Sequence, residues 1–166
     1  VHHHLPAARA VERLDRRLDF EAFRKRDGGF RLPSETPQMN GNGADTMEFE
    51  GKVAVITGAG QGLGAGFAKD FARQGAKVVL LGRTLSKVEK VAGEIRAEGG
   101  WALALGCDVG DRDQVKASFA RISAEVGGVD ILVNNAAYHR SLSVLDTSIE
   151  EWDKHIDSNL NGTFYC

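Results

Sequence analysis

Apolar residues form a continuous run before a glycine-rich turn and recur at every fourth position after it. Val53–Ile56 is short, apolar and rich in β-branched residues, which is typical of a buried parallel strand. After the turn, Leu63, Phe67 and Phe71 recur every fourth residue, as along one stripe of a helix. We therefore expect a strand, a turn and a helix that stops at Gly75, a natural left-handed cap position.

The same alternation of apolar runs and helical stripes continues along the chain. Further strands are expected at residues 76–81, 101–106 and 130–134. Further helices are expected to begin at Leu85, after Asp111 and after Ser148, the last two being good N-cap residues. Four strands alternating with helices predict right-handed βαβ units and an α/β fold with a doubly wound parallel sheet of the Rossmann type.

The first 46 residues differ in composition from the remainder. Residues 7–26 place apolar side chains at helical spacing among alternating arginines and carboxylates, which predicts a charged amphipathic helix. The acidic residues there argue against a transit peptide. Residues 27–45 contain paired glycines, prolines and Asn-Gly steps, so we expect a flexible linker. Residues 47–166 carry the predicted strands and helices and form the expected Rossmann-type domain.

Composition narrows the class of protein. In this chain of 166 residues the net charge of −2 gives no basis for binding nucleic acid or an anionic membrane. No apolar run approaches the roughly 20 residues that cross a bilayer. Cys107 and Cys166 lack metal-ligand spacing, and the histidines at positions 2–4 are expected to be solvated, so no metal site is predicted. We expect a reduced, cytoplasmic protein without nucleic-acid or membrane partners.

The turn after the first strand has the composition of a phosphate-binding loop. Glycines lack a Cβ atom, so the backbone can approach a pyrophosphate, and the first N–H groups of the following helix face the anion. A purely structural turn is the alternative, but the flanking strand and helix favour a nucleotide site. No Lys-Ser/Thr pair follows, so the turn is not a P-loop. The candidate ligand-binding residues here are Gly58, Gly60, Gln61, Gly62, Leu63 and Gly64.

The end of the second strand points to the choice of cofactor. A dinucleotide-binding fold often places Asp or Glu there to bond the adenosine ribose 2′-hydroxyl, but this chain has Gly82 followed by Arg83. Without a carboxylate nothing repels a 2′-phosphate, and a guanidinium can bind it through two parallel hydrogen bonds. A helix-capping or solvated arginine is the alternative. We expect NADP(H) to be favoured over NAD(H).

Four motifs in order resemble those of the short-chain dehydrogenase/reductase family, from Phe49 to the last residue. The first is the spacing of Thr57-Gly58-x-x-x-Gly62-x-Gly64 within the turn. The others are Asp108-Val109, Asn134-Asn135-Ala136-Ala137 and the Asn159 segment, with Ala137 standing where the family has glycine. The resemblance implies an oxidoreductase that transfers hydride between a nicotinamide and a small carbonyl or alcohol substrate, with a homo-oligomeric full-length form.

The resemblance also implies roles for single residues. Asp108 would accept a hydrogen bond from the adenine amino group while Val109 lies against the ring. Asn134 would brace the sheet, and Asn135 and Ala136 would contact the cofactor ribose. Asn159 matches the asparagine of the family's catalytic Asn-Ser-Tyr-Lys tetrad. NADP-preferring relatives often carry a basic residue where this chain has Gln61, which weakens the NADP(H) prediction.

The proton-transfer half of that chemistry is missing from the sequence. The family needs a tyrosine followed four residues later by lysine, but Leu142 follows Tyr138 and nothing stands four residues after Tyr165. An unperturbed tyrosine, with a pKa of about 10, is a poor acid near neutrality. We expect an inactive amino-terminal part of an oxidoreductase, cut after the fourth strand and its helix, with that strand at a sheet edge. The alternative is a complete, non-catalytic dinucleotide-binding or interaction module.

Overall fold

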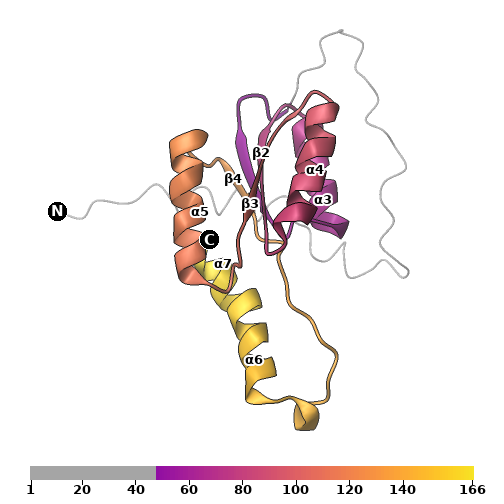
Figure 1. The fold of residues 1–166 in the computed structure, drawn as a ribbon, viewed down its shortest axis with the longest axis vertical. Helices are drawn as coiled ribbons and strands as arrows, with labels where there is room; N and C mark the ends of the chain where they lie inside the picture. Colours follow the sequence, from indigo (N-terminus) through magenta and orange to yellow (C-terminus); the bar gives the residue numbers. More distant parts are fainter. Residues whose placement is uncertain (1–47) are drawn as a thin grey trace, which may run out of the picture. The chain divides into compact units, whose positions relative to one another are not determined.

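A computed structural model describes residues 48–166, so the predicted helix and linker of residues 1–46 lie outside the described part. The strands are β1 (Val53–Thr57), β2 (Lys77–Gly82), β3 (Trp101–Gly106) and β4 (Ile131–Val133). The α-helices are α3 (Gly62–Arg73), α4 (Leu85–Ala97), α5 (Arg112–Glu125), α6 (Ile149–Ile156) and α7 (Gly162–Tyr165). A 3₁₀ turn, η1 (Val144–Asp146), precedes α6, and a π-helix, η2 (Asp157–Asn161), joins α6 to α7 (Figure 1).

The four strands form one parallel sheet in the order β3-β2-β1-β4. The chain moves from β1 outward through β2 to β3 and then returns to place β4 on the other side of β1. This reversal creates a crevice at the carboxyl ends of β1 and β4, which is where open α/β sheets bind ligands. The predicted fold class is confirmed, and β4 lies at an edge of the sheet as expected.

Helices cover both faces of the sheet, with α3 and α4 on one side and α5 on the other (Figure 1). Side chains of consecutive strand residues point to opposite faces, so each central strand contributes to both cores. Ile56 and Leu80 pack into the core under α3 and α4, whereas Val55 and Val79 pack into the core under α5. All four are fully buried, which explains the continuous apolar runs in the sequence.

The helix α3 presents small side chains to the sheet and not its large apolar stripe. Gly64 and Ala68 are its buried residues, whereas Leu63 is 75% exposed and Phe67 is 40% exposed. Only Phe71, whose ring lies 4.9 Å from that of Phe49, is partly buried in the core. The spacing of apolar residues at every fourth position predicted the helix correctly. The large residues do not face the sheet, because the close approach of α3 to the end of β1 requires small residues at the contact.

The predicted helix ends agree with the structure. The Asp111 side chain accepts from the backbone N–H groups of Asp113 and Gln114, and Ser148 accepts from that of Glu151. Gly75, Gly99 and Gly127 adopt positive φ angles of 88°, 88° and 97° just after the helices α3, α4 and α5, a conformation that glycine adopts without strain.

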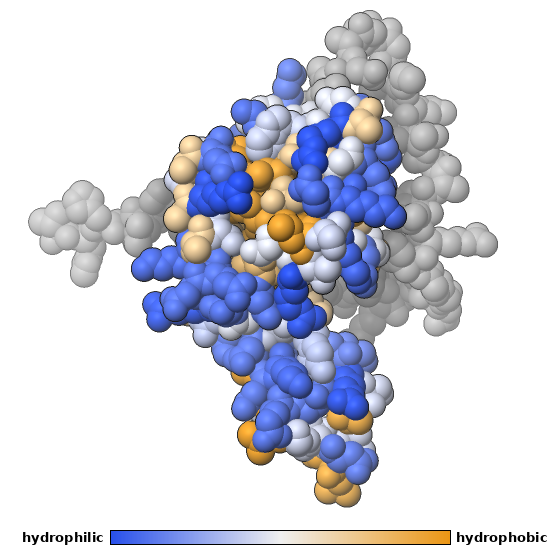
Figure 2. All heavy atoms as spheres, in the orientation of Figure 1, coloured by the Kyte–Doolittle hydropathy of each residue, from blue (hydrophilic) through white to orange (hydrophobic). Residues whose placement is uncertain are grey.

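Hydrophilic residues cover much of the face drawn in Figure 2, while apolar residues are exposed at the end of the molecule that holds η1 and the start of α6. There Val144 and Leu145 are 90% and 97% exposed, and Ile149 is 72% exposed. No helix within residues 48–166 has the length and apolar character needed to cross a membrane.

Candidate functional site

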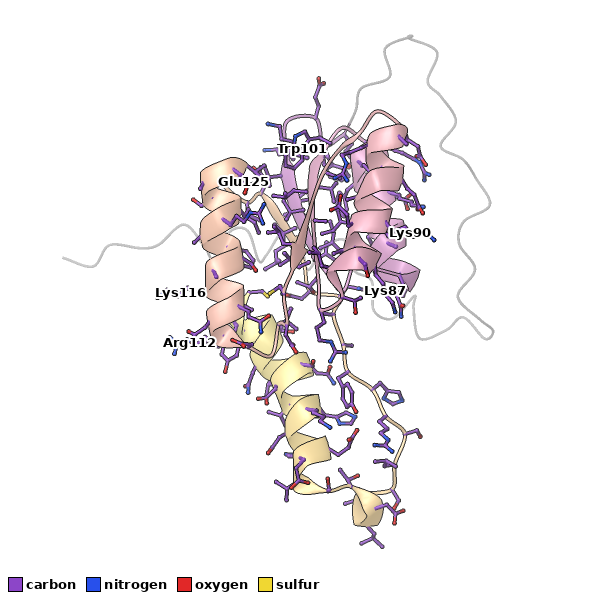
Figure 3. The ribbon with its side chains drawn as sticks, in the orientation of Figure 1. Lys87, Lys90, Trp101, Arg112, Lys116 and Glu125 are labelled. Carbon is purple, nitrogen blue, oxygen red and sulfur yellow. The ribbon has the colours of Figure 1, made fainter. Side chains whose placement is uncertain are left out.

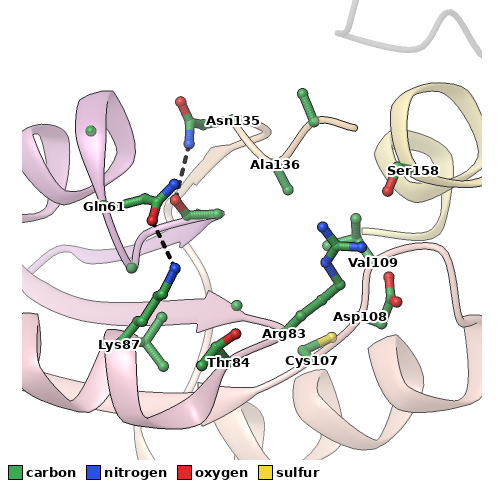
Figure 4. A pocket seen from close by; sticks show the side chains of 16 residues that line it. Gln61, Arg83, Thr84, Lys87, Cys107, Asp108, Val109, Asn135, Ala136 and Ser158 are labelled. Carbon is green, nitrogen blue, oxygen red and sulfur yellow. Dashed lines mark hydrogen bonds between the residues drawn. The ribbon is translucent and has the colours of Figure 1, made fainter. Parts of the chain in front are cut away.

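A pocket of about 350 Å³ lies at the carboxyl ends of β1, β2 and β3, beside the loop that follows β4 (Figure 4). It coincides with the crevice created by the reversal of strand order. Most of the residues that the sequence nominated for ligand binding line it: Gly58, Gly60, Gln61, Gly62, Arg83, Asp108, Val109, Asn135 and Ala136. Of the other nominated residues, Leu63, Gly64 and Asn159 do not line the pocket.

Thr57 joins the ends of the two strands that border the crevice. Its hydroxyl accepts hydrogen bonds from the backbone N–H groups of Asn135, at 3.0 Å, and Ala136, at 2.9 Å. In return, the Asn135 amide donates to the carbonyl of Thr57 at 3.0 Å. Thr57 is 1% exposed, so its hydroxyl would be costly to leave without partners. Thr57 was identified from the sequence only as the first residue of the glycine-turn motif, without this bonding role.

The amide that braces the sheet is Asn135, which corrects the expectation for Asn134. Asn134 is exposed, whereas Asn135 is half-buried and bonded across to β1. Successive side chains at a strand end point to opposite faces, so only one of two consecutive asparagines can face the turn after β1.

The glycines of the turn are required for two different reasons. A Cβ atom on Gly58 would lie 2.8 Å from the Cα atom of Ala136, and one on Gly64 would lie 2.5 Å from both the Asn135 amide nitrogen and the Gly58 carbonyl oxygen. Packing therefore leaves no space for a side chain at either of these two positions. Gly62 has open space around it but adopts a φ angle of +57°, so its requirement is conformational.

The N-terminus of α3 opens toward the pocket and lacks a side-chain capping hydrogen bond. Gln61 is the N-cap residue, its side chain makes no capping hydrogen bond, and the first turn carries no acidic residue. The first N–H groups of a helix have no partner within the helix, and its dipole places positive charge there. The turn therefore fits an anionic phosphate group.

Packing disfavours a side chain at the end of β2. A Cβ atom on Gly82 would lie 2.8 Å from the Cγ1 atom of Val88, which is fully buried. An Asp or Glu at this position would therefore require the Val88 side chain to shift. Arg83, the next residue, is exposed and extends its guanidinium across the pocket mouth (Figure 4). The pocket is thus positively charged at the point where many dinucleotide sites are negative.

The third strand contributes an acidic residue and an apolar residue to the pocket. Asp108 Oδ1 accepts from the backbone N–H of Gly110 at 3.0 Å, which fixes the carboxylate, and its Oδ2 has no hydrogen-bond partner among the described residues. Val109 is buried against Gly162, where a Cβ atom would lie 2.8 Å from the Cγ2 atom of Val109. A hydrogen-bond acceptor beside an apolar wall suits an aromatic ring with an amino group.

Asn159 lies in the π-helix η2 and holds the loop after β4. Its side-chain oxygen accepts from the backbone N–H of Tyr138 at 2.8 Å, and its amide donates to the carbonyl of the same residue at 2.9 Å. The Asn159 carbonyl accepts from the Thr163 hydroxyl at 3.1 Å. A π-helical turn often marks a functional position, because it redirects side chains that a continuous helix would bury.

Tyr138 is not prepared for proton transfer near neutral pH. Its hydroxyl donates to Oε1 of Glu151 at 2.5 Å, and this hydrogen bond is the main cause that raises the tyrosine pKa above its ordinary value of 10.0. Glu151 is 5% exposed and also lies 3.4 Å from the Arg140 guanidinium. The arrangement stabilises the protonated tyrosine.

Several lining residues were missed by the sequence analysis: Thr84, Lys87, Val88, Cys107, Ala137 and Ser158. Thr84, Lys87 and Val88 belong to the first turn of α4 and its cap. Local spacing did not indicate Lys87, because Arg83 precedes the helix and Lys87 reaches the pocket only through the packing of α4 on the glycine turn. Within residues 48–166, no three His, Cys, Asp or Glu side chains lie close enough to hold a metal ion.

A comparison with known families identifies the chain. The family model described as short chain dehydrogenase matches residues 52–166, which is more than half of its length. The chain belongs to the short-chain dehydrogenase family. This membership agrees with the parallel sheet, the glycine turn and the position of the pocket.

Relatives of this short-chain dehydrogenase chain are named oxidoreductases. It is 45% identical over 117 residues to oxidoreductase UcpA of Salmonella typhimurium, an alignment that covers 70% of this chain and 44% of UcpA. The chain thus spans less than half the length of that relative.

Solved structures similar to this chain are described with either nicotinamide cofactor. One is a metagenomic short-chain oxidoreductase in complex with NADP, with 36% identity, a TM-score of 0.68, and coverage of 70% of this chain and 53% of that chain. Another is 3-ketoacyl-(acyl-carrier-protein) reductase from Brucella melitensis complexed with NADH, with 41% identity, a TM-score of 0.65, and coverage of 70% and 47%. Similarity alone therefore leaves the choice between the two cofactors open.

Proposed function

We propose that this chain forms the NADP(H)-binding part of a short-chain oxidoreductase that transfers hydride between a nicotinamide and a small carbonyl or alcohol substrate. The observation that carries the proposal is the pocket at the strand ends, with an uncapped helix N-terminus at the glycine turn and Arg83 in place of an acidic residue. Both features are complementary to phosphate.

The residues present fit the cofactor part by part. The glycine turn leaves space that a side chain would fill, and the first turn of α3 would hold the diphosphate. Asp108 and Val109 would bind the adenine, and Asn135 and Ala136 would contact a ribose of the cofactor. When bound, the nicotinamide donates or accepts the hydride, and the role of this chain is to bind and orient the cofactor.

The preference for NADP(H) follows from charge and packing at the end of β2. A side chain at Gly82 would require the buried Val88 side chain to shift, and this chain has no carboxylate there to bond a 2′-hydroxyl and repel a 2′-phosphate. Arg83 has no carboxylate partner within salt-bridge distance among the described residues, so its guanidinium is available to an anionic ligand. A guanidinium binds phosphate through paired hydrogen bonds.

We expect this chain to bind the cofactor but not to catalyse the reaction. Residues 1–166 contain no Tyr-x-x-x-Lys, and Tyr138 is held in its protonated form by Glu151. We expect the 166-residue chain to bind NADPH without reducing carbonyl substrates, because no positioned acid delivers the proton that accompanies hydride. The names of the relatives support an oxidoreductase over a non-catalytic binding module.

Calorimetric titration of the 166-residue chain with NADPH and NADH tests the proposal. The expected result is saturable binding of both, with NADPH tighter by about tenfold or more because of the charge-assisted contacts to its 2′-phosphate. NADPH oxidation would then be followed with a panel of ketones and aldehydes, where no turnover is expected. Tighter binding of NADH would overturn the NADP(H) preference, and absence of any binding would overturn the cofactor site itself.

A further inference from the structure

Lys87 reaches from the first turn of α4 to the glycine turn. Its Nζ atom donates to the side-chain oxygen of Gln61 at 3.0 Å, and both residues line the pocket (Figure 4). The backbones are also close here, because a Cβ atom on Gly60 would lie 2.9 Å from the Cβ atom of Lys87. Packing of α4 against the turn therefore brings the lysine into the pocket.

The charge of Lys87 is not neutralised by the protein. Its partner Gln61 is a neutral amide, and no carboxylate among the described residues lies within salt-bridge distance of its ammonium group. Lys69 on α3 pairs with Glu94, and Arg96 on α4 pairs with Glu89. Lys90 on α4 also has no carboxylate within salt-bridge distance among the described residues, but it does not line the pocket.

The neighbourhood of Lys87 suits a phosphate group. Thr84 caps α4 without using its hydroxyl for a capping hydrogen bond, and the first turn of α4 contains no acidic residue. Thr84 lines the same pocket between Arg83 and Lys87. Figure 4 shows the Lys87 ammonium on the Gln61 side of Thr84 and the Arg83 guanidinium on the Val109 side. An anion bound above Thr84 would lie between the two cations, and each charge-assisted contact would add to its affinity.

We propose that Lys87, held in place by Gln61, is a second cationic ligand of the cofactor 2′-phosphate and acts together with Arg83. The inference rests on the proposed NADP(H) function and deepens it. It also explains how the chain binds a 2′-phosphate although its glycine turn carries Gln61 in place of a basic side chain: the positive charge arrives from α4.

A purely structural role is the competing explanation for the Lys87–Gln61 contact. A lysine that only ties α4 to the turn would affect ligands with and without a 2′-phosphate equally. The deciding probes are therefore adenosine 2′,5′-bisphosphate and adenosine 5′-monophosphate, which differ by that phosphate alone. The affinities of both would be measured by calorimetry on the 166-residue chain.

The variants are Lys87→Met, Lys87→Arg and Arg83→Ala, with Lys90→Met as the matched control. Lys90 lies on the same helix but points away from the sheet and does not line the pocket (Figure 3). We expect Lys87→Met to weaken the bisphosphate about tenfold and to change the monophosphate less than about twofold. Lys87→Arg and Lys90→Met should stay near wild type. Melting temperatures verify that each variant is folded.

A double variant adds a further comparison. Gln61→Arg places a cation in the turn itself, so Lys87→Met should reduce the affinity for the bisphosphate less in the Gln61→Arg chain than in the wild-type chain. Equal losses of both probes in Lys87→Met would overturn the proposal in favour of a structural tie. Unchanged affinities in that variant, with a loss of bisphosphate binding in Arg83→Ala, would overturn it while leaving the NADP(H) function intact. Equal affinities of the wild-type chain for both probes would overturn both.

Discussion

The Tyr138 hydroxyl donates a hydrogen bond to Glu151 Oε1 at 2.5 Å, joining the loop after β4 to the helix α6. The same loop is held by Asn159, which bonds both backbone groups of Tyr138. His155 adds an edge-on ring contact to Tyr138 at 4.9 Å. The loop after β4 is therefore held at Tyr138 by hydrogen bonds from both its side chain and its backbone.

We predict that Tyr138→Phe lowers the melting temperature, because the buried Glu151 carboxylate loses its shortest hydrogen bond. Tyr165→Phe is the matched control, since the described residues offer its hydroxyl no hydrogen-bond partner. Thermal unfolding followed by circular dichroism measures both. An unchanged melting temperature for Tyr138→Phe would mean that the bond does not stabilise the loop.

The stabilisation by this pair should depend on pH in a defined direction. The hydrogen bond from Tyr138 is the main cause that holds the pKa of Glu151 below its ordinary value of 4.5. A carboxylate with a depressed pKa stabilises the fold above its unfolded-state pKa and loses that contribution as the pH falls through its folded-state pKa. The melting-temperature difference between wild type and Tyr138→Phe should therefore hold from neutrality down to pH 4.5 and shrink below it.

Melting curves of both chains at several pH values supply the measurement. At the alkaline end the tyrosine, with its raised pKa, should keep its proton and its bond up to pH 10. A difference that persists unchanged well below pH 4.5 would show that the ionised carboxylate is not the acceptor.

Gly64 and Gly66 stand two residues apart in α3 and should respond oppositely to alanine. A Cβ atom on Gly64 would meet a backbone oxygen at 2.5 Å, so Gly64→Ala should destabilise the fold by about 1–3 kcal/mol and weaken NADPH binding. Gly66 has nothing within 4 Å of a Cβ atom, so Gly66→Ala should stabilise the helix by about 1 kcal/mol. Urea unfolding of both variants checks this, and equal effects would contradict the packing argument.

The sequence predicted those features that depend on neighbouring residues. The N-caps at Asp111 and Ser148 involve hydrogen bonds within a few residues, and the apolar runs of the strands reflect burial on both faces. The pocket-lining glycines and Arg83 were found because their spacing is a local pattern.

Features that depend on contacts between distant segments were not predictable in this way. Thr57 binds residues nearly eighty positions later, and the choice of Asn135 over Asn134 depends on which side chain faces β1. Lys87 meets Gln61 only because α4 packs on the glycine turn. The apolar stripe of α3 is exposed because the helix lies too close to the end of β1 for large side chains at the contact, and the periodicity of the sequence does not reveal that distance.

We propose that Gly82 and Arg83 select NADP(H), and the affinity ratio for NADPH over NADH in Arg83→Ala tests this proposal most directly. Loss of the guanidinium should weaken NADPH by about 1.5–3 kcal/mol, roughly 10- to 100-fold, and leave NADH almost unchanged. Calorimetric titration of wild type and variant with both cofactors gives the ratio. A collapse of the ratio is the predicted result, whereas equal losses for the two cofactors would contradict the assignment.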